Sequence, residues 1–423
     1  MNIEVHHSHL AGKVAAIASK SQGHRIIIAA ALSDKPTTIN INASSKDIEA
    51  TLNVIDALGA GIQWLDSDKL LITPLTKAAP KAILNCSESG STLRFLLPVA
   101  AALNGREYVF TGKGKLPKRP MEPLLNELKN HGATIKGTEL PLKISGKPQG
   151  GTYSLPGNIS SQFISGLLFA LPLLEEDSQI IITSPRESQG YINMTLATLK
   201  LFGVKIEEQA NGYFIKGRQQ YTSPGTITVE GDWSNAAFWF VAAALRGEIS
   251  VTGLNPHSLQ GDKKILPILE AMGAQITVAD GAVTVAQSPL KALEIDAGEI
   301  PDLVPPLAVA ATAAQGATVI KNAARLRIKE CDRLFAMAQT LALLGGDIQE
   351  TDDGLIIKGT PKLNGGKVTG FNDHRIVMSA AVSSLLSPNP VIIAGAEAVE
   401  KSYPHFFRDF QQLGGLVNVL YLR

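Results

Sequence analysis

A repeat of about 70 residues runs through the chain and restricts its possible folds more than any other feature. Six segments each join a helix-like stretch that ends in glycine to a short stretch rich in β-branched residues. Their first glycines lie at residues 59, 132, 203, 273, 345 and 414. Glycine after a periodic apolar stretch predicts a helix end, because it adopts the left-handed conformation at little steric cost. Such even spacing is typical of a chain built from copies of one structural unit.

A second marker repeats with the same period. Six segments rich in alanine and leucine begin near His24, Ser91, Ser161, Ser234, Asp302 and His374. They are apolar on almost every side, which predicts helices buried on all faces. We therefore expect an α/β fold in which each unit has a buried helix, a strand, an amphipathic helix and two or more further strands.

The length of the chain and its shortened last unit predict two domains. A chain of 423 residues exceeds what a single core usually holds. The last unit has only 50 residues, His374 to Arg423, and the N-terminal stretches NIEVH and GKVAAIA could supply its missing strands. The N-terminus should then pair back with the last unit. We expect one domain at 20–230, a discontinuous one at 1–19 plus 231–423, and a cleft between them that closes on a ligand.

Composition excludes several classes of function. The net charge of +1 gives no overall attraction to nucleic acid or to an acidic membrane. With two cysteines, no disulfide framework is implied and a reducing compartment is expected. The first residues lack a secretory signal pattern, and no apolar run reaches the ~20 residues of a membrane span. A soluble, cytoplasmic protein is expected.

Charged and hydroxyl side chains gather at the predicted starts of the buried helices. Helix N-termini favour anions, but Ser, Asp and Asn there are also routine caps, and for Asp232, Ser234 and Asn235 capping is the favoured interpretation. Capping does not explain the cations at these starts, which are Lys20, Arg25, Arg94, Arg119, Arg333 and Arg375. For Arg25 and Arg94, inside apolar helices, an internal ion pair is the alternative to ligand binding.

The segment RIKECDRL, residues 327–334, packs acids and bases together before an apolar helix. A solvated charged turn is the usual explanation for such a run. Alternatively, Glu330 beside Lys329 and Arg333 could have a proton affinity suited to proton transfer.

Together these segments resemble the 3-phosphoshikimate 1-carboxyvinyltransferases, also called EPSP synthases. The resemblance rests on SKSQGHR, SGSTLR, KRPMEP, SSQF, SQGY, EGDWS, IPD, IKECDR, NDHR and EKSYPHFF, which occur in this order. It implies two domains of three βαβαββ units each, the inside-out α/β barrel of the enolpyruvyl transferases. It also implies transfer of the enolpyruvyl group of phosphoenolpyruvate to the 5-hydroxyl of shikimate 3-phosphate, a step of chorismate and aromatic amino acid biosynthesis.

The resemblance implies roles for individual residues. Those expected to bind shikimate 3-phosphate are Lys20, Ser21, Arg25, Ser160, Ser161, Gln162, Ser188, Tyr191, Asp302, Arg325 and Lys329. Those expected to bind phosphoenolpyruvate are Lys20, Gly90, Arg119, Gln162, Arg333, Arg375 and Lys401. Asp302 would be the base toward the hydroxyl, with Lys20 and Glu330 managing the C3 proton and the departing phosphate. No metal, cofactor or nucleic acid is expected to take part, and a monomer is expected.

Two other functions are alternatives. The related enolpyruvyl transferase that acts on UDP-N-acetylglucosamine carries a reactive cysteine in a mobile loop, and the corresponding stretch TGKGKLPKRP contains none. A non-catalytic repeat scaffold for anionic partners would need the cations but no acid-base set. Lys20, Asp302 and Glu330 together argue against that scaffold.

Overall fold

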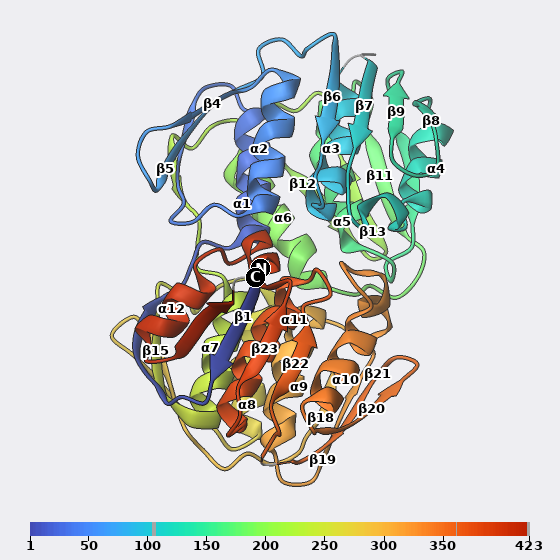
Figure 1. Cartoon of the computed structure of the whole chain (residues 1–423). Coiled ribbons are helices and arrows are strands. Elements are labelled where there is room, and N and C mark those ends of the chain that lie inside the picture. The colour runs from blue at the N-terminus through green and yellow to red at the C-terminus, as the bar shows by residue number, and fades with distance from the viewer. Residues whose placement is uncertain (104–106, 361, 421–423) are drawn as a thin grey trace. The chain divides into compact units, whose positions relative to one another are not determined.

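The computed structural model describes residues 1–103, 107–360 and 362–420 (Figure 1). The chain divides into two compact units, which we call unit 1 (Met1–Ile17 and Glu230–Arg423) and unit 2 (Ala18–Val229). The described residues form six four-stranded sheets, three in each unit.

Unit 2 repeats one arrangement of a sheet and two helices three times. Its sheets have the strand orders β14–β3–β5–β4, β6–β7–β9–β8 and β10–β11–β13–β12. The strands are β3 (Thr37–Asn40), β4 (Gly61–Trp64), β5 (Lys69–Thr73), β6 (Lys81–Asn85), β7 (Glu107–Thr111), β8 (Thr134–Lys136), β9 (Leu142–Ser145), β10 (Gly151–Leu155), β11 (Ser178–Ile182), β12 (Ile206–Gln209), β13 (Gly212–Ile215) and β14 (Thr226–Thr228). The helices are α1 (Lys20–Ala31), α2 (Lys46–Leu58), α3 (Gly90–Ala102), α4 (Glu122–Asn130), α5 (Ser161–Ala170) and α6 (Gln189–Leu201).

Unit 1 has the same architecture. Its sheets have the orders β16–β17–β15–β2, β18–β19–β21–β20 and β22–β23–β1–β24. The strands are β1 (Asn2–His6), β2 (Leu10–Ala15), β15 (Gly247–Thr252), β16 (Gln275–Ala279), β17 (Ala282–Ala286), β18 (Glu294–Asp296), β19 (Ala317–Lys321), β20 (Asp347–Thr351), β21 (Gly354–Lys358), β22 (Gly366–Thr369), β23 (Val391–Ala394) and β24 (Leu416–Leu420). The helices are α7 (Trp233–Arg246), α8 (Ile265–Ala271), α9 (Val304–Ala313), α10 (Arg333–Leu343), α11 (His374–Ser383) and α12 (Phe406–Gln412), and short 3-10 turns precede several of them, including η3 (Gly261–Lys264), η4 (Pro301–Leu303) and η5 (Ala324–Ile328).

The odd-numbered helices form the cores of both units. In α7, every residue from Trp233 to Leu245 is buried, and α9 is buried from Val304 to Thr312. The even-numbered helices bury one face only; α4, for example, buries Leu124, Leu125 and Leu128. The predicted α/β fold with fully buried central helices is confirmed.

The six marker glycines all have left-handed backbone conformations. Their φ angles lie between 79° and 113° at residues 59, 132, 203, 273, 345 and 414. Side chains with a Cβ rarely adopt this conformation, whereas glycine adopts it readily. The prediction that these glycines end helices is therefore confirmed.

Three strands, β1, β2 and β14, join sheets of repeats that lie far from them in the sequence. Strand β1 lies between β23 and β24 and is antiparallel to both, which confirms the predicted return of the N-terminus to the last repeat. The second N-terminal strand was predicted wrongly, because β2 instead pairs in parallel with β15 of the fourth repeat. The last repeat does not need β2, because β22 already pairs with β23 as its first strand. The fourth repeat does need a strand, because β14, which directly precedes its helix α7, pairs with β3 in unit 2. The fourth repeat therefore takes its first strand from the N-terminal segment.

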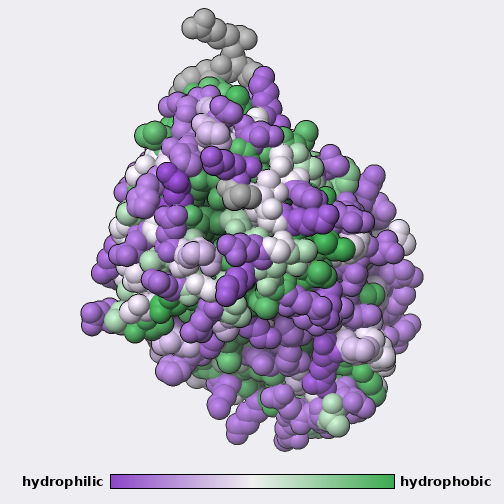
Figure 2. All heavy atoms as spheres, turned by 90° about the horizontal axis from the view of Figure 1, so that it is seen from below, coloured by the Kyte–Doolittle hydropathy of each residue, from purple (hydrophilic) through white to green (hydrophobic). Residues whose placement is uncertain are grey.

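Hydrophilic residues cover most of the face shown in Figure 2, and hydrophobic residues are scattered among them. This agrees with the burial of the apolar odd-numbered helices inside their units. Within residues 1–103, 107–360 and 362–420, no helix is both long enough and apolar enough to cross a membrane.

Candidate functional site

Most starts of the buried helices are capped by hydroxyl or carboxylate side chains. Ser19, Ser89 and Ser160 each accept a hydrogen bond from a backbone N–H in the first turn of α1, α3 and α5. Asp232 and Asp373 cap α7 and α11 in the same way. A capping hydroxyl accepts through a lone pair, so it can still donate its own hydrogen to an anion. Capping and anion binding are therefore compatible at Ser160.

Arg25 is a buried cation held by neutral groups. Its Nε donates to Oγ1 of Thr195 at 2.8 Å, and its Nη1 and Nη2 donate to the carbonyls of Ser21 and Tyr191 at 2.6 and 2.9 Å. The guanidinium also lies 4.9 Å from the centre of the Phe95 ring. Burial lowers the pKa of Arg25 to about 10. In the described part of the chain Arg25 makes no ion pair, so its charge can serve an anionic ligand.

Lys20, one turn before His24 on α1, does have an internal partner. Its Nζ lies 2.9 Å from a carboxylate oxygen of Asp47 in the first turn of α2. Both side chains are largely buried. An anion that binds Lys20 must therefore share the ammonium with Asp47 or displace it.

The starts of α3 and α5 meet in unit 2. Gln162 donates from Nε2 to Oγ of Ser91 at 2.8 Å and accepts at Oε1 from Nη1 of Arg94 at 2.9 Å. Arg94 also donates to the carbonyl of Pro120 at 3.1 Å. The sequence prediction placed Gln162 in both substrate sites, and its amide lies at the junction of these two helix starts.

Gly90 and Arg119 form a close contact at the first residue of α3. A Cβ atom added at Gly90 would lie 2.7 Å from Nη1 of Arg119, closer than real Cβ atoms come to other heavy atoms. A larger residue at this position would push the flexible end of Arg119 away from the helix N-terminus, where an anion would meet both the arginine and the helix dipole.

The start of α6 completes this group in unit 2. Ser188 precedes α6 in a left-handed conformation with φ of 56°, and it is buried. Thr195 on α6 donates to Oγ of Ser165 on α5 at 2.8 Å, and it accepts from Arg25 on α1. These contacts join α1, α5 and α6. We define the unit 2 cluster as Lys20, Ser21, Arg25, Gly90, Arg119, Ser160, Ser161, Gln162, Ser188 and Tyr191.

Arg333 is the centre of a group of charges in unit 1. Only 2% of its side chain is exposed. Its Nε lies 2.7 Å from Asp373, its Nη1 2.7 Å from Asp302, and its Nη2 2.9 Å from Glu330. These contacts join the starts of α9, α10 and α11, so the acid-base run at 327–334 lies beside Asp302.

Asp302 accepts hydrogen bonds from a second arginine. Nη2 of Arg375 donates to its Oδ2 at 3.1 Å, and Nη1 donates to its carbonyl at 3.1 Å. Burial would raise the pKa of Asp302, but Arg375, Lys329 and Arg333 together hold it well below its usual value. Burial also lowers the pKa of Lys329 to about 8, although Asp302 opposes the shift. Asp302 is therefore ionised, and Lys329 loses its proton more readily than an exposed lysine.

Lys401 and Arg325 bind backbone carbonyls. Nζ of Lys401 donates to the carbonyl of Asn372 at 2.6 Å. Asn372 and Phe371 are both left-handed, with φ of 54° and 49°, an unusual conformation for residues other than glycine. Nη2 of Arg325 donates to the carbonyl of Gly298 at 2.5 Å. With these two, the unit 1 cluster comprises Asp302, Arg325, Lys329, Glu330, Arg333, Arg375 and Lys401.

Three carboxylates beside these clusters were missed as site residues by the sequence analysis. Asp373 is fully buried and binds Arg333, and its place just before a buried helix was the available signal. Asp47 follows the cap Ser45 of α2 and binds Lys20. Asp262 on η3 accepts a hydrogen bond from Ser234, and the sequence gives no local signal for it. The predicted capping role is correct for Asp232 but wrong for Ser234 and Asn235, because the side chain of Asp232 caps α7 by accepting from the backbone N–H of Asn235.

The described part of the chain contains no group of three or more His, Cys, Asp or Glu side chains arranged to hold a metal ion. Both cysteines, Cys86 and Cys331, are buried.

Comparison with known proteins identifies the family. The family model described as EPSP synthase (3-phosphoshikimate 1-carboxyvinyltransferase) matches residues 5–410. A 3-phosphoshikimate 1-carboxyvinyltransferase of Clostridium novyi (strain NT) is 44% identical over 429 residues, covering 99% of this chain and 98% of the relative. One of Clostridium acetobutylicum is 47% identical over 417 residues, covering 97% and 96%. A solved structure of EPSP synthase from Acinetobacter baumannii is similar with a TM-score of 0.82 at 27% identity, covering 99% of this chain and all of that one. The family match, the relatives and the shared fold agree along nearly the whole length, and the chain belongs to the EPSP synthase family.

Proposed function

We propose that this chain transfers the enolpyruvyl group of phosphoenolpyruvate to the 5-hydroxyl of shikimate 3-phosphate, with release of phosphate. The observation that carries the proposal is the family match over residues 5–410. The two clusters support it, because they supply the cations and the acid-base groups that this addition-elimination needs. The reaction belongs to the biosynthesis of chorismate and the aromatic amino acids.

In this proposal the unit 2 cluster binds most of shikimate 3-phosphate. Arg25 is buried without an ion pair in the described part of the chain, and a phosphate is the kind of dianion that a guanidinium binds strongly. Ser160, Ser161 and Gln162 at the start of α5 would donate to the ring oxygens and the phosphate. Ser188 and Tyr191 would do so from α6.

Phosphoenolpyruvate would bind Arg119 beside Gly90 in unit 2 and Arg333, Arg375 and Lys401 in unit 1. Arg333 and Arg375 share internal carboxylates, so the ligand would exchange one anionic partner for another. Such an exchange avoids leaving a buried cation without an anion, which would be costly.

The same exchange would prepare Asp302 to act as a base. Arg375 and its neighbours keep the pKa of this buried carboxylate low, which makes Asp302 a weak proton acceptor. When Arg375 and Arg333 turn to the carboxylate of phosphoenolpyruvate, that restraint weakens and the pKa of Asp302 rises. Asp302 could then accept the proton of the 5-hydroxyl as its oxygen adds to C2.

The C3 proton must be delivered during addition and removed during elimination. Lys20 and Glu330 together are the proposed groups for these transfers of the C3 proton and for stabilising the departing phosphate. Elimination of phosphate and of one C3 proton from the tetrahedral adduct restores the double bond. If Glu330→Gln exchanges solvent hydrogen into C3 at the normal rate, Glu330 does not have this role.

We also propose that the two clusters face a common cleft between the predicted domains, 20–230 and 1–19 plus 231–423, and that the cleft closes on both substrates. Cations at helix starts in both units support this arrangement. The protein would work as a cytoplasmic monomer without nucleic acid. Light scattering should give the mass of one chain, and small-angle scattering should show a smaller radius of gyration once shikimate 3-phosphate is added. A dimer mass, or an unchanged radius at saturation, would contradict the respective proposals.

A phosphate-release assay with alternative acceptors tests the function itself. Release should require both phosphoenolpyruvate and shikimate 3-phosphate. Release with UDP-N-acetylglucosamine alone as acceptor would establish the other enolpyruvyl transferase reaction, although the stretch Thr111 to Pro120 lacks a cysteine. If neither acceptor leads to phosphate release but the protein still binds phosphate, the result would favour the non-catalytic scaffold.

A further inference from the structure

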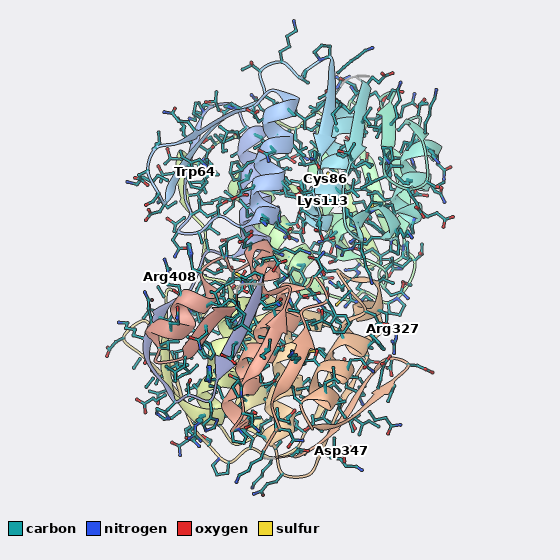
Figure 3. All side chains as sticks on the ribbon, in the orientation of Figure 1. Trp64, Cys86, Lys113, Arg327, Asp347 and Arg408 are labelled. Atoms are coloured by element: carbon teal, nitrogen blue, oxygen red, sulfur yellow. The ribbon has the colours of Figure 1, made fainter. Side chains whose placement is uncertain are left out.

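Arg327, near the end of η5, holds one end of the acid-base segment to a neighbouring hairpin. Its Nε donates to the carbonyl of Asp352 at 2.9 Å, and its Nη2 donates to the carbonyl of Thr351 at 2.6 Å. Its Nη1 lies 2.6 Å from Oε1 of Glu350. All three acceptors lie at the end of β20 or in the turn toward β21. Figure 3 labels Arg327 at this end of unit 1.

The same guanidinium also binds the first turn of α10. Its Nη1 lies 2.9 Å from Oδ2 of Asp332, while Oδ1 of Asp332 accepts from the backbone N–H of Phe335 at 3.1 Å and so caps α10. The residue after this cap is Arg333, the centre of the unit 1 cluster. Arg327 and Asp332 therefore bracket the segment that carries Lys329 and Glu330.

The hairpin is itself fixed to the segment before η5. The backbone N–H groups of Ala323 and Asn322 donate to the carbonyl and the carboxylate of Asp353, at 2.7 and 3.0 Å. The β20–β21 turn is thus bound to Asn322 and Ala323, which precede the acid-base segment. Through its contact with Asp332, Arg327 also connects the turn to the C-terminal end of that segment.

We propose that Arg327 is a positioning residue, which fixes Lys329, Glu330 and Arg333 relative to Asp302 by fastening their segment to the β20–β21 hairpin. This role rests on the proposed function, in which Lys329 binds shikimate 3-phosphate, Arg333 binds phosphoenolpyruvate and Glu330 takes part in transfer of the C3 proton. The hydrogen bonds of Arg327 go to the carbonyls of Asp352 and Thr351 and to the carboxylates of Glu350 and Asp332, and none of these four residues is a proposed substrate-binding residue.

The geometry requires arginine. Four contacts leave one planar group in different directions, and a lysine ammonium on its flexible stem cannot reproduce that fork. The side chain is 29% exposed, so each ion pair contributes little to stability. A small misplacement of catalytic groups, in contrast, can lower the rate about 100-fold. The expected effect is therefore larger on catalysis than on folding.

The competing interpretation is a surface ion pair that only stabilises unit 1. The control is Asp347→Asn, which removes the exposed pair between Asp347 and Lys358 (3.7 Å) at the other end of the same hairpin. Asp347 is labelled in Figure 3, well away from Arg327. Both variants lose one charged contact of β20, but only Arg327→Gln releases the acid-base segment.

Two measurements on the full-length protein test the proposal. Amide hydrogen exchange in residues 328–335 should accelerate at least about 10-fold in Arg327→Gln and stay unchanged in Asp347→Asn. In the phosphate-release assay, kcat/KM for phosphoenolpyruvate should fall about 10- to 100-fold in Arg327→Gln, with a smaller change in the KM for shikimate 3-phosphate. Arg327→Lys keeps the charge and should lose most of the same activity, and it replaces the glutamine variant if that one does not fold.

Each outcome decides the proposal. If the wild type is active and Arg327→Gln or Arg327→Lys matches it in kcat/KM, or if only the melting temperature falls, the positioning role is wrong. If the wild type releases no phosphate, the proposed function fails, and amide exchange alone then decides whether Arg327 fixes the segment. Normal exchange in residues 328–335 overturns the inference in either case.

Discussion

Replacement of Arg333 by methionine removes the cation that three carboxylates share in unit 1. Methionine has a similar length and fills much of the same space without charge. Asp373, which has no exposed surface, loses its contact at 2.7 Å, and Asp302 and Glu330 lose theirs at 2.7 and 2.9 Å. We expect the variant to lose both stability and activity.

The size of the stability loss follows from the burial of each partner. Removing one partner of a buried ion pair typically costs about 3–5 kcal/mol, because the other charge stays buried. Asp302 keeps Arg375, and its side chain is 17% exposed, so it adds little to the loss. The main contribution comes from Asp373, and we expect the free energy of unfolding to fall by about 3–5 kcal/mol.

Tryptophan fluorescence can report this loss for unit 1 alone. Trp233 and Trp239 are buried in α7, whereas Trp64, labelled in Figure 3, is 40% exposed in unit 2. Urea titrations in a Trp64→Phe background would therefore follow unit 1. Asp373→Asn is the matched rescue, because asparagine caps a helix about as well as aspartate but leaves no buried charge.

The reasoning would be refuted by a loss below about 1 kcal/mol, the size of an exposed ion pair. It would also be refuted if Arg333→Met with Asp373→Asn were no more stable than Arg333→Met alone. We expect the double variant to recover at least about 1 kcal/mol, since the uncompensated charge is the main cost.

Three further predictions concern individual side chains. Arg25→Met should raise the KM for shikimate 3-phosphate at least about 100-fold, since charge-assisted hydrogen bonds contribute about 1.5–3 kcal/mol each. The melting temperature should also fall, because the hydroxyl of Thr195 and the carbonyls of Ser21 and Tyr191 lose their donor. Steady-state kinetics and thermal unfolding check both, and an unchanged KM would contradict the assignment. Gly90→Ala should raise the KM for phosphoenolpyruvate about 10-fold, roughly 1.4 kcal/mol, because the added Cβ would lie 2.7 Å from Nη1 of Arg119 and must push that guanidinium aside. An unchanged KM in kinetic assays would contradict the expected need for this position of the guanidinium. Burial and the nearby Asp302 raise the pKa of Asp262 to about 7, so between about pH 4 and pH 7 the folded protein binds more protons than the unfolded chain and stability falls as pH rises through that window. Asp262→Asn should therefore gain more stability over the wild type at pH 8 than at pH 4.5 in thermal unfolding, and an equal difference at both pH values would contradict this.

Features encoded within a few residues were predicted well. The glycine after each helix and the aspartate before α7 act through the backbone of one helical turn, and Gly132 and Asp232 have the conformation or contact expected of them. The buried helices were also identified correctly, because their apolar character is continuous and needs no knowledge of neighbours. Sequence reasoning was weaker for partners. It left an internal ion pair open for Arg25, whose contacts in the described chain are with neutral groups.

The sequence by itself determined that this chain is built from six copies of one α/β unit, and which cations stand at the helix starts. Only the tertiary structure decided that β2 joins the fourth repeat and that Asp373, Asp302 and Glu330 share Arg333. The reason is physical. Helix periodicity and capping depend on groups within one turn, whereas strand pairing and charge pairing depend on groups that the folded chain brings together, such as Leu10 with Gly247.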